Sequence, residues 1–503
     1  MNRVAAAFTV WALAIVSATS SKQGLTTASW VKSARAFIAP LALAQFICSF
    51  AGSNMNVMIN DISHDLHTDV KGVQTTITLF LLIMAVLMIP CSKLTDRWGR
   101  KRCFVGGLIL YGIGTVLSAV APNLGVLILG NSVFQGVGTA FLIPPVYILT
   151  TMAFTSLESR AKAFGAISGM GGIGAAMGPL IGGVITSGIS WRAAFLFQAL
   201  VVGLIILLSR RVVDPVPPNP EQRFDAVGAI LSAVGMFCLV FGILQAGVNN
   251  TLLVIFLVIG IGFLAAFYLW VRSRERAGKE ALLHTDLFRN RISNLGLITQ
   301  NLQWLLLMGV SFVVSVFLQT ERHYSAIKTG VIFTAATLGV LVSSLAAERL
   351  AKRRPQRTLI AGGFAVTVAG IILLLVLVKA ASSSPWAFAP GLLLIGLGVG
   401  VMLTPSVNLV QSAFPEDKQG EISGLSRSVS NLGSSFGTAV AGTILVSNLV
   451  SGNATYVAAM IVLAAVGLAG LAFGLRLPSN PLPAPQADVA AAVPPARPLD
   501  APG

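Results

Sequence analysis

The sequence predicts an all-α membrane protein built from two related six-helix bundles, with two extra helices between them. Of the 503 residues, 55% are hydrophobic and only 10% are charged, with a mean hydropathy of +0.83. Polar groups are therefore too few to cover a soluble globule. Apolar stretches of about 20 residues recur along the chain, each long enough to cross a hydrocarbon layer about 30 Å thick as a helix. Parts of the first half also recur in the second half.

We expect fourteen membrane-spanning helices, because fourteen apolar stretches alternate with more polar segments. The period-two alternation that a membrane β-barrel requires is missing. The expected spans lie near residues 37–58, 73–91, 103–121, 125–148, 163–187, 193–209, 225–246, 252–271, 292–318, 328–347, 358–379, 386–410, 421–447 and 453–475.

These spans divide the chain into five parts. The tail is rich in Pro and Ala and poor in aromatic residues, which is typical of disorder. The apolar run near the start is expected to be an interfacial segment or an over-extended start, with a signal-like region or an added span as the alternatives. The predicted parts are 1–36, an N-terminal segment; 37–209, a six-helix bundle; 210–291, a linker with two extra transmembrane helices; 292–475, a second six-helix bundle; and 476–503, a disordered tail.

The basic residues predict the orientation in the membrane. Segment 92–102, between the second and third spans, holds five cationic side chains and one acid. Lys and Arg collect in cytoplasmic loops. With this segment inside, 28 of the 34 Lys and Arg residues fall in segments assigned to the cytoplasm. The net charge of +16 is thus spread over loops, which argues against nucleic acid as a partner.

A repeat links the two halves. Segment 165–169 (GAISG) recurs as 420–424 (GEISG), and at the same offset of 255 residues Gly178 and Gly182 correspond to Gly433 and Gly437. Two related bundles can rock about a central site near the bilayer midplane. The repeat therefore favours transport by alternating access.

Glycines follow one side of the fifth expected span. Gly174, Gly178 and Gly182 recur every four residues, which places them on one helix face. A face without side chains lets another helix approach closely, and a proline permits a local bend. This face is either a packing surface alone or also a pivot. The full run is Gly165, Gly174, Gly178, Pro179, Gly182 and Gly183.

These segments resemble motifs of a known family. The glycine run is similar, at every fixed position, to motif C of major facilitator antiporters, G-x8-G-x3-G-P-x2-G-G. Segment 92–102 resembles motif A of the same superfamily. Segments 190–192 (SWR) and 223–225 (RFD) are similar to parts of the fourteen-span drug:proton antiporter family. The resemblance covers about residues 37 to 475.

The resemblance implies a major facilitator fold and a secondary active exporter. Such a protein moves amphipathic small molecules, drug-like or antibiotic-like, out of a bacterial cell by alternating access. The proton is the implied coupling ion, the lipid bilayer of the plasma membrane the implied location, and a monomer the expected state. For motif A the resemblance implies a conformational role for Asp96, Arg97, Gly99, Arg100 and Lys101.

Other functions stay open at this point. Export of a lipid or an endogenous metabolite, uncoupled facilitation and a sensor that does not transport are the alternatives. No enzyme activity, cofactor or metal is expected, because the sequence holds no H-E-x-x-H motif, no G-x-x-x-x-G-K-[ST] phosphate loop and no cysteines at ligand spacing.

Three positions depart from the family pattern, and the smallest departure is Ser92, which stands where the family usually opens motif A with Gly. Segment 128–138 resembles motif B, but Ser132 stands where the family has a buried arginine. In the first span, Ala51 stands where the family often has an aspartate. Proton antiport needs a titrating group in the membrane, usually a carboxylate or a histidine. We find none deep in an expected span.

Polar residues inside the spans are the candidates for a substrate cavity, because lipid offers them no hydrogen-bond partners. Arg427 lies about two turns into the thirteenth span, and a cation at that depth should face the interior. It could attract an anionic substrate, replace the missing charge of motif B, or bond only to helix carbonyls. The candidates are Asn54, Asn56, Asn131, Gln135, Gln300, Asn301, Gln303 and Arg427, with Gln45 in the same group.

Overall fold

The structure, a computed structural model, describes residues 25–478 apart from 155–156, 211, 213, 215–217, 219–223, 246–248, 352, 381–383, 415–417 and 447–452. Within this part of the chain every regular element is a helix. The apolar run near the start and the predicted tail beyond residue 478 lie outside the described residues.

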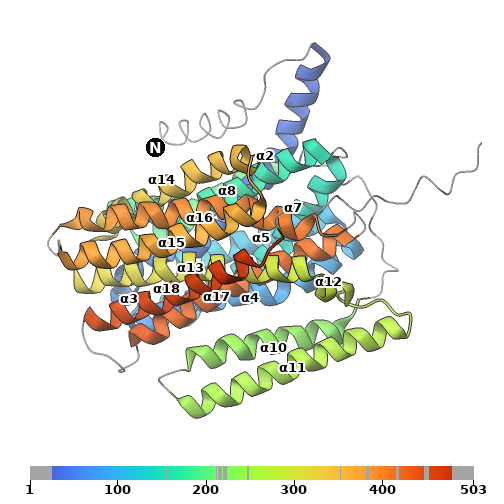
Figure 1. Cartoon of the computed structure of the whole chain (residues 1–503). Coiled ribbons are helices and arrows are strands. Elements are labelled where there is room, and N and C mark those ends of the chain that lie inside the picture. Colours follow the sequence, from blue (N-terminus) through green and yellow to red (C-terminus); the bar gives the residue numbers. More distant parts are fainter. Residues whose placement is uncertain are drawn as a thin grey trace, which may run out of the picture.

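Six long helices form the first bundle (Figure 1). The fourth runs from α6 (Leu124–Leu127) through the π-helix η2 (Ile128–Gln135) into α7. Outside the bundle's long helices, η1 (Met55–Val57) and α3 (Ile59–Asp65) follow the first. The long helices are α2 (Leu25–Asn54), α4 (Val70–Trp98), α5 (Arg100–Ala119), α7 (Gly136–Ala153), α8 (Leu157–Gly188) and α9 (Trp191–Ser209).

Six further helices form the second bundle. The first of them continues into the π-helix η3 (Phe317–Glu321) and is preceded by the short α12 (Asp286–Arg289), while η4 (Pro385–Phe388) leads into the fourth. The long helices are α13 (Arg291–Val316), α14 (Ala326–Ala351), α15 (Gln356–Ala380), α16 (Ala389–Gln411), α17 (Gln419–Val446) and α18 (Asn453–Leu475).

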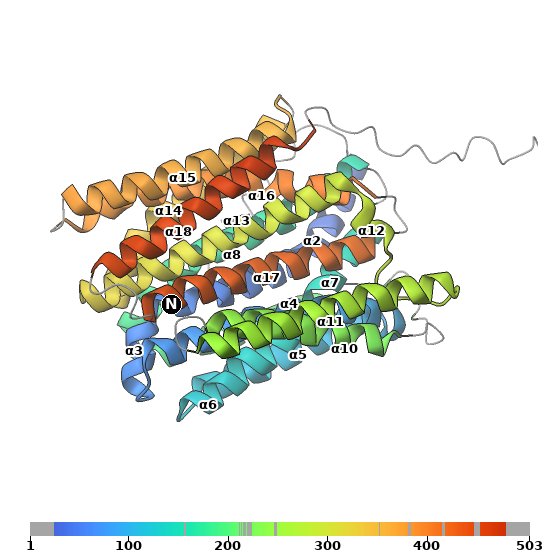
Figure 2. The ribbon, with the colours of Figure 1, turned by 60° about the horizontal axis from the view of Figure 1, so that its bottom comes forward.

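Helix contacts correspond between the two bundles. Within the first bundle α2 packs on α8 and α5 on α9; within the second, α13 packs on α17 and α15 on α18. Across the bundles, α4 packs on α17 and α8 packs on α14. In each case, helices that hold the same position in the order of their bundle make the same contact. The long helices run side by side in both views (Figures 1 and 2), so the all-α fold of two related six-helix bundles is confirmed.

The two extra helices, α10 (Ala226–Leu244) and α11 (Asn250–Arg276), pack on each other at the edge of the molecule (Figure 1). Helix α10 also contacts α4 and α17, and Val240 joins an apolar cluster with Leu82, Val86 and Ala439. Most residues of α11 face outward. An exposed face this apolar is suited to lipid.

Thirteen helices of the described chain are long and apolar enough to cross a membrane. The remaining expected span, 421–447, forms α17, which has 28 residues. This helix contains many Ser, Gly and Thr residues, so it is less hydrophobic than the other spans. Fourteen spans therefore stay a prediction, as do the bounds of the five predicted parts.

Polar side chains define several helix starts. Asp69 accepts a hydrogen bond from the backbone nitrogen of Gly72 (2.8 Å), and Ser190 accepts one from Ala193 (3.2 Å). Asn290 accepts from both Ile292 and Ser293. Each satisfies backbone donors that a first helical turn leaves free. These caps place the ends of α4, α9 and α13.

Candidate functional site

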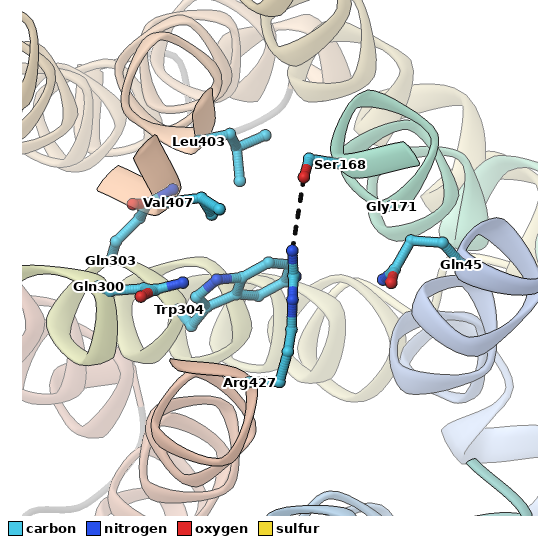
Figure 3. A pocket seen from close by; sticks show the side chains of 9 residues that line it. All are labelled: Gln45, Ser168, Gly171, Gln300, Gln303, Trp304, Leu403, Val407 and Arg427. Carbon is cyan, nitrogen blue, oxygen red and sulfur yellow. Dashed lines mark hydrogen bonds between the residues drawn. The ribbon is translucent and has the colours of Figure 1, made fainter. Parts of the chain in front are cut away.

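A small pocket lies between the two bundles (Figure 3). The centre of a water molecule can occupy a volume of about 10 Å³ in this pocket. This is about the smallest volume that holds one water molecule. Sites for drug-sized ligands measure about 300–1,000 Å³, so the pocket must widen to hold one. It is lined by Gln45, Ser168 and Gly171 of the first bundle and by Gln300, Gln303, Trp304, Leu403, Val407 and Arg427 of the second.

Arg427 on α17 faces this pocket with only 8% of its surface exposed. One guanidinium nitrogen donates to the Ser168 hydroxyl at 3.4 Å, a bond that joins the two bundles (Figure 3). The guanidinium carbon lies 4.4 Å from the centre of the Tyr147 ring, a favourable cation–π position. Among the described residues Arg427 forms no ion pair with an acid.

Glutamines form the polar wall of the pocket. Gln300 accepts a hydrogen bond from Ser426 (2.9 Å), and Gln303 accepts one from Ser406 (3.0 Å). Gln45 accepts one from the Tyr147 hydroxyl (3.2 Å). The amide nitrogen of Gln300 has no hydrogen-bond partner among the described residues, although the side chain is buried. The wall thus presents one free donor beside a buried cation.

Of the predicted cavity residues, the structure brings together Gln45, Gln300, Gln303 and Arg427. Asn54 instead lies against Gly182, Asn301 donates to the Val429 carbonyl (2.9 Å), and Gln135 donates to Ser118 (3.4 Å). Each of these three side chains contacts a neighbouring helix of its own bundle. The predicted candidates that do not line the pocket in this conformation are Asn54, Asn56, Asn131, Gln135 and Asn301.

Five pocket residues were not among the predicted candidates. Trp304 could have been found, because it follows Gln300 by four residues and so shares its helix face. Ser168 lies in the repeated GAISG segment. The others, Gly171, Leu403 and Val407, carry no signal that separates them from ordinary packing residues.

The motif A residues surround the junction of α4 and α5. Gly99 has a φ of +96°, a conformation that side chains disfavour. Arg100 donates to Asp96 at 2.8 Å, and the backbone nitrogens of Arg100 and Lys101 donate to Asp214 at 2.8 and 3.3 Å. A carboxylate at a helix N-terminus is stabilised by the helix dipole.

Arg97 lies apart from this network. Together with Trp98 and Arg102 it lines a separate groove of about 720 Å³ beside α5.

A charge cluster joins the bundles at the end that the basic residues place in the cytoplasm. Lys93 of α4 donates to Glu421 of α17 at 2.5 Å. His284, in the loop after α11, lies 2.8 Å from the same carboxylate and also bonds to it through its backbone nitrogen (3.2 Å). We call Lys93, His284 and Glu421 the inner cluster. Sequence reasoning did not identify it, because its members lie far apart in the chain.

Other contacts join the bundles at the opposite end. Gln319 donates to the Asn56 carbonyl (2.7 Å) and Asn60 donates to the Gln319 carbonyl (2.7 Å). Ser187 accepts a bond from the backbone nitrogen of Ile327 (2.8 Å). The bundles therefore touch at both ends of the small central pocket.

The glycine run of α8 lies against two helices. A Cβ added to Gly174 would lie 2.3 Å from the Phe46 carbonyl of α2, and one added to Gly183 would lie 2.4 Å from the Ala326 carbonyl of α14. In the second bundle, a Cβ on Gly437 would lie 2.2 Å from the Leu305 carbonyl of α13. Gly165 meets nothing within 4 Å and so takes no part in this packing.

The chain matches the family model of the Major Facilitator Superfamily over residues 41–438, and again over residues 297–500. The chain belongs to the Major Facilitator Superfamily. As a major facilitator protein it is a transporter of small molecules and not an enzyme, and its apolar helices place it as a multi-pass protein in the bacterial plasma membrane.

Relatives of this major facilitator protein include a resistance protein, a probable transporter and a multidrug efflux pump. It is 30% identical to a puromycin resistance protein of Streptomyces alboniger over 80% of each chain. It is 27% identical to a probable actinorhodin transporter of Streptomyces coelicolor, covering 78% of this chain and 69% of the relative. It is 26% identical to the multidrug efflux pump LfrA of Mycolicibacterium smegmatis, covering 85% and 83%.

Proposed function

We propose that this protein exports amphipathic small molecules, drug-like or antibiotic-like, through the plasma membrane by alternating access. The observation that carries this proposal is the pocket between the bundles, which is sealed by contacts at both ends and too small for a substrate. Rocking of two related bundles would open it to one side at a time. The names of the relatives favour drugs or antibiotics as substrates.

The cross-bundle hydrogen bonds are suited to such a movement. At the end opposite the inner cluster they join uncharged groups, and at the inner end they join the three members of the inner cluster. Each contact contributes about 1 kcal/mol. A few can break at one end while the others hold. The matching contacts of α4 with α17 and of α8 with α14 give the two bundles equivalent surfaces for the movement.

We further propose the proton as the coupling ion and the monomer as the working state, because the resemblance to drug:proton antiporters implies both. None of the described residues that line the pocket is a carboxylate or a histidine. A coupling proton would therefore have to bind outside the pocket.

Reconstituted vesicles test the export proposal. Vesicles loaded with puromycin or with actinorhodin, the compounds named for two relatives, should lose at least one of them faster with the protein than without it, and faster still when the proton concentration is higher outside the vesicle than inside. An efflux rate that does not depend on the proton gradient would indicate an uncoupled facilitator. No efflux of puromycin or of a wider antibiotic panel would indicate a sensor and contradict the proposal.

A further inference from the structure

We propose that the central pocket binds its substrates through an anionic group, such as a carboxylate or phenolate, with Arg427 as the charged partner. This inference rests on the proposed export function and names the chemical class of the substrate. It is built on three features of the pocket: a cation without a counter-ion, a hydrogen-bond donor without a partner among the described residues, and a hydrogen bond that would break when the bundles separate.

The first feature is the uncompensated charge of Arg427. A guanidinium stays protonated in proteins, and its described partners are the uncharged Ser168 hydroxyl and the Tyr147 ring. A buried charge without a counter-ion is unfavourable in a low dielectric. An anionic ligand would supply the missing charge, whereas a cationic ligand would face a like charge with no acid in the pocket wall to offset it.

The second feature is the free donor of Gln300. The side chain is 1% exposed, and its amide nitrogen has no partner among the described residues. The bond from Ser426 to the amide oxygen (2.9 Å) fixes the amide orientation, and the nitrogen points toward the middle of the pocket in Figure 3. A donor beside a cation is suited to an oxygen that only accepts, as a carboxylate does.

The third feature is the bond between Arg427 and Ser168. It is long, 3.4 Å, and it joins residues of different bundles. Separation of the bundles would break it and leave the guanidinium facing the widened pocket. A ligand oxygen would then take the place of the Ser168 hydroxyl. Trp304 in the wall offers a flat apolar surface, so the ligand is expected to carry an aromatic ring next to its anionic group.

Three probes of one shape test the inference. They are 2-naphthoate, 2-naphthamide and 2-naphthylmethylammonium, which carry an anionic, a neutral and a cationic group on the same ring. Their affinities for the purified full-length protein are measured by equilibrium dialysis. We expect naphthoate to bind about tenfold or more tightly than the cation, as a buried charged partner requires. Equal affinities, or no binding of naphthoate, would overturn the inference.

Variants test whether Arg427 causes the preference for the anionic probe. Arg427→Gln should weaken naphthoate binding about tenfold or more while leaving naphthamide within about twofold. Arg427→Lys should keep part of the preference, because it retains the charge without the planar fork. Arg272→Gln makes the same chemical change at an exposed position of α11 and should change neither affinity. If Arg427→Gln does not fold, Arg427→Lys and the three-probe comparison still decide.

Efflux of the same probes separates this inference from the proposed function. Preferential binding of naphthoate without efflux would leave the inference standing and contradict export. Efflux of all three probes at equal rates would leave export standing and overturn the anionic preference.

Discussion

Lys93 of α4 and Glu421 of α17 form an ion pair of 2.5 Å between the two bundles, at the end of the molecule assigned to the cytoplasm. The pair is largely buried, with 21% and 12% of the two side chains exposed, so water screens it less than a surface pair. Because α4 and α17 must part for the pocket to open on this side, the pair is expected to hold the inner end closed.

Removal of this pair should make the inner end open more often. Lys93→Gln is expected to lower the cost of opening by about 1 kcal/mol, or about fivefold in the open population. The readout is maleimide labelling, from the cytoplasmic side, of a cysteine placed at Ser92, which is buried and faces Gly424, with the four native cysteines replaced. Arg289→Gln, which breaks the exposed pair with Asp286, is the control and should leave labelling unchanged. Equal labelling in Lys93→Gln and the parent would exclude the pair as a latch.

The glycine face of α8 should tolerate no side chain where α2 approaches. Gly174→Ala places a Cβ 2.3 Å from the Phe46 carbonyl, and a backbone atom cannot move aside without shifting α2. We expect a loss of about 1–3 kcal/mol in stability and slower efflux, measured by thermal unfolding and by vesicle assay. Gly165→Ala is the matched control in the same motif, because nothing lies within 4 Å of its added Cβ. Parent-like unfolding of Gly174→Ala would show that the contact can relax.

Substitution in motif A should affect transport more than folding. Asp96→Asn weakens the bond to Arg100 (2.8 Å), an i,i+4 pair that contributes about 0.5 kcal/mol to helix stability. We expect normal membrane insertion and a thermal midpoint near that of the parent, but slower efflux. Asp286→Asn, at an exposed pair in α12, serves as the control. Unchanged efflux by Asp96→Asn would remove this residue from the transport cycle.

Acid should weaken one contact on the opposite side of the membrane. The hydrogen bond from Arg192 holds the pKa of the Asp65 carboxyl below its ordinary value, assisted by the indole of Trp191 (3.0 Å). A lowered pKa in the folded protein means stabilisation that is present above the unfolded pKa of about 3.9 and lost as pH falls through the folded value. Arg192→Gln should therefore lower the unfolding midpoint more at neutral pH than in strong acid, where it removes only the contacts that do not titrate with Asp65, namely the bond to the Ala121 carbonyl (2.9 Å) and the cation–π contact with Trp191. A difference that persists undiminished in strong acid would contradict this account.

The sequence could predict the fold because long apolar stretches leave few alternatives to membrane helices. It also predicted that Arg427 faces the interior, since contact with lipid at that depth is unfavourable for a cation. The π-helix η2, over Ile128–Gln135, carries no comparable signal, and helix α17 is the expected span that composition supports least.

The pocket was predicted in part. Residue spacing predicts which side chains share a face of one helix, but it does not predict which helix packs against that face. Gln300 and Gln303 lie three residues apart and share a face. Asn301, one position after Gln300, is turned by about 100°, and its amide contacts the α17 backbone instead. Polarity alone could not separate these residues, since it does not state how each helix is rotated in the bundle.

His284 belongs to the loop that follows α11, yet it shares the Glu421 carboxylate with Lys93. In the same loop, Leu282 and Leu283 are buried in an apolar cluster that contains Ile89 of α4 and Ile422 of α17. Parting of α4 from α17 must therefore displace this loop or detach it from one of the two helices. Because residues 279–285 do not line the pocket, we expect sequence changes in this connector to alter the turnover rate more than the substrate affinity.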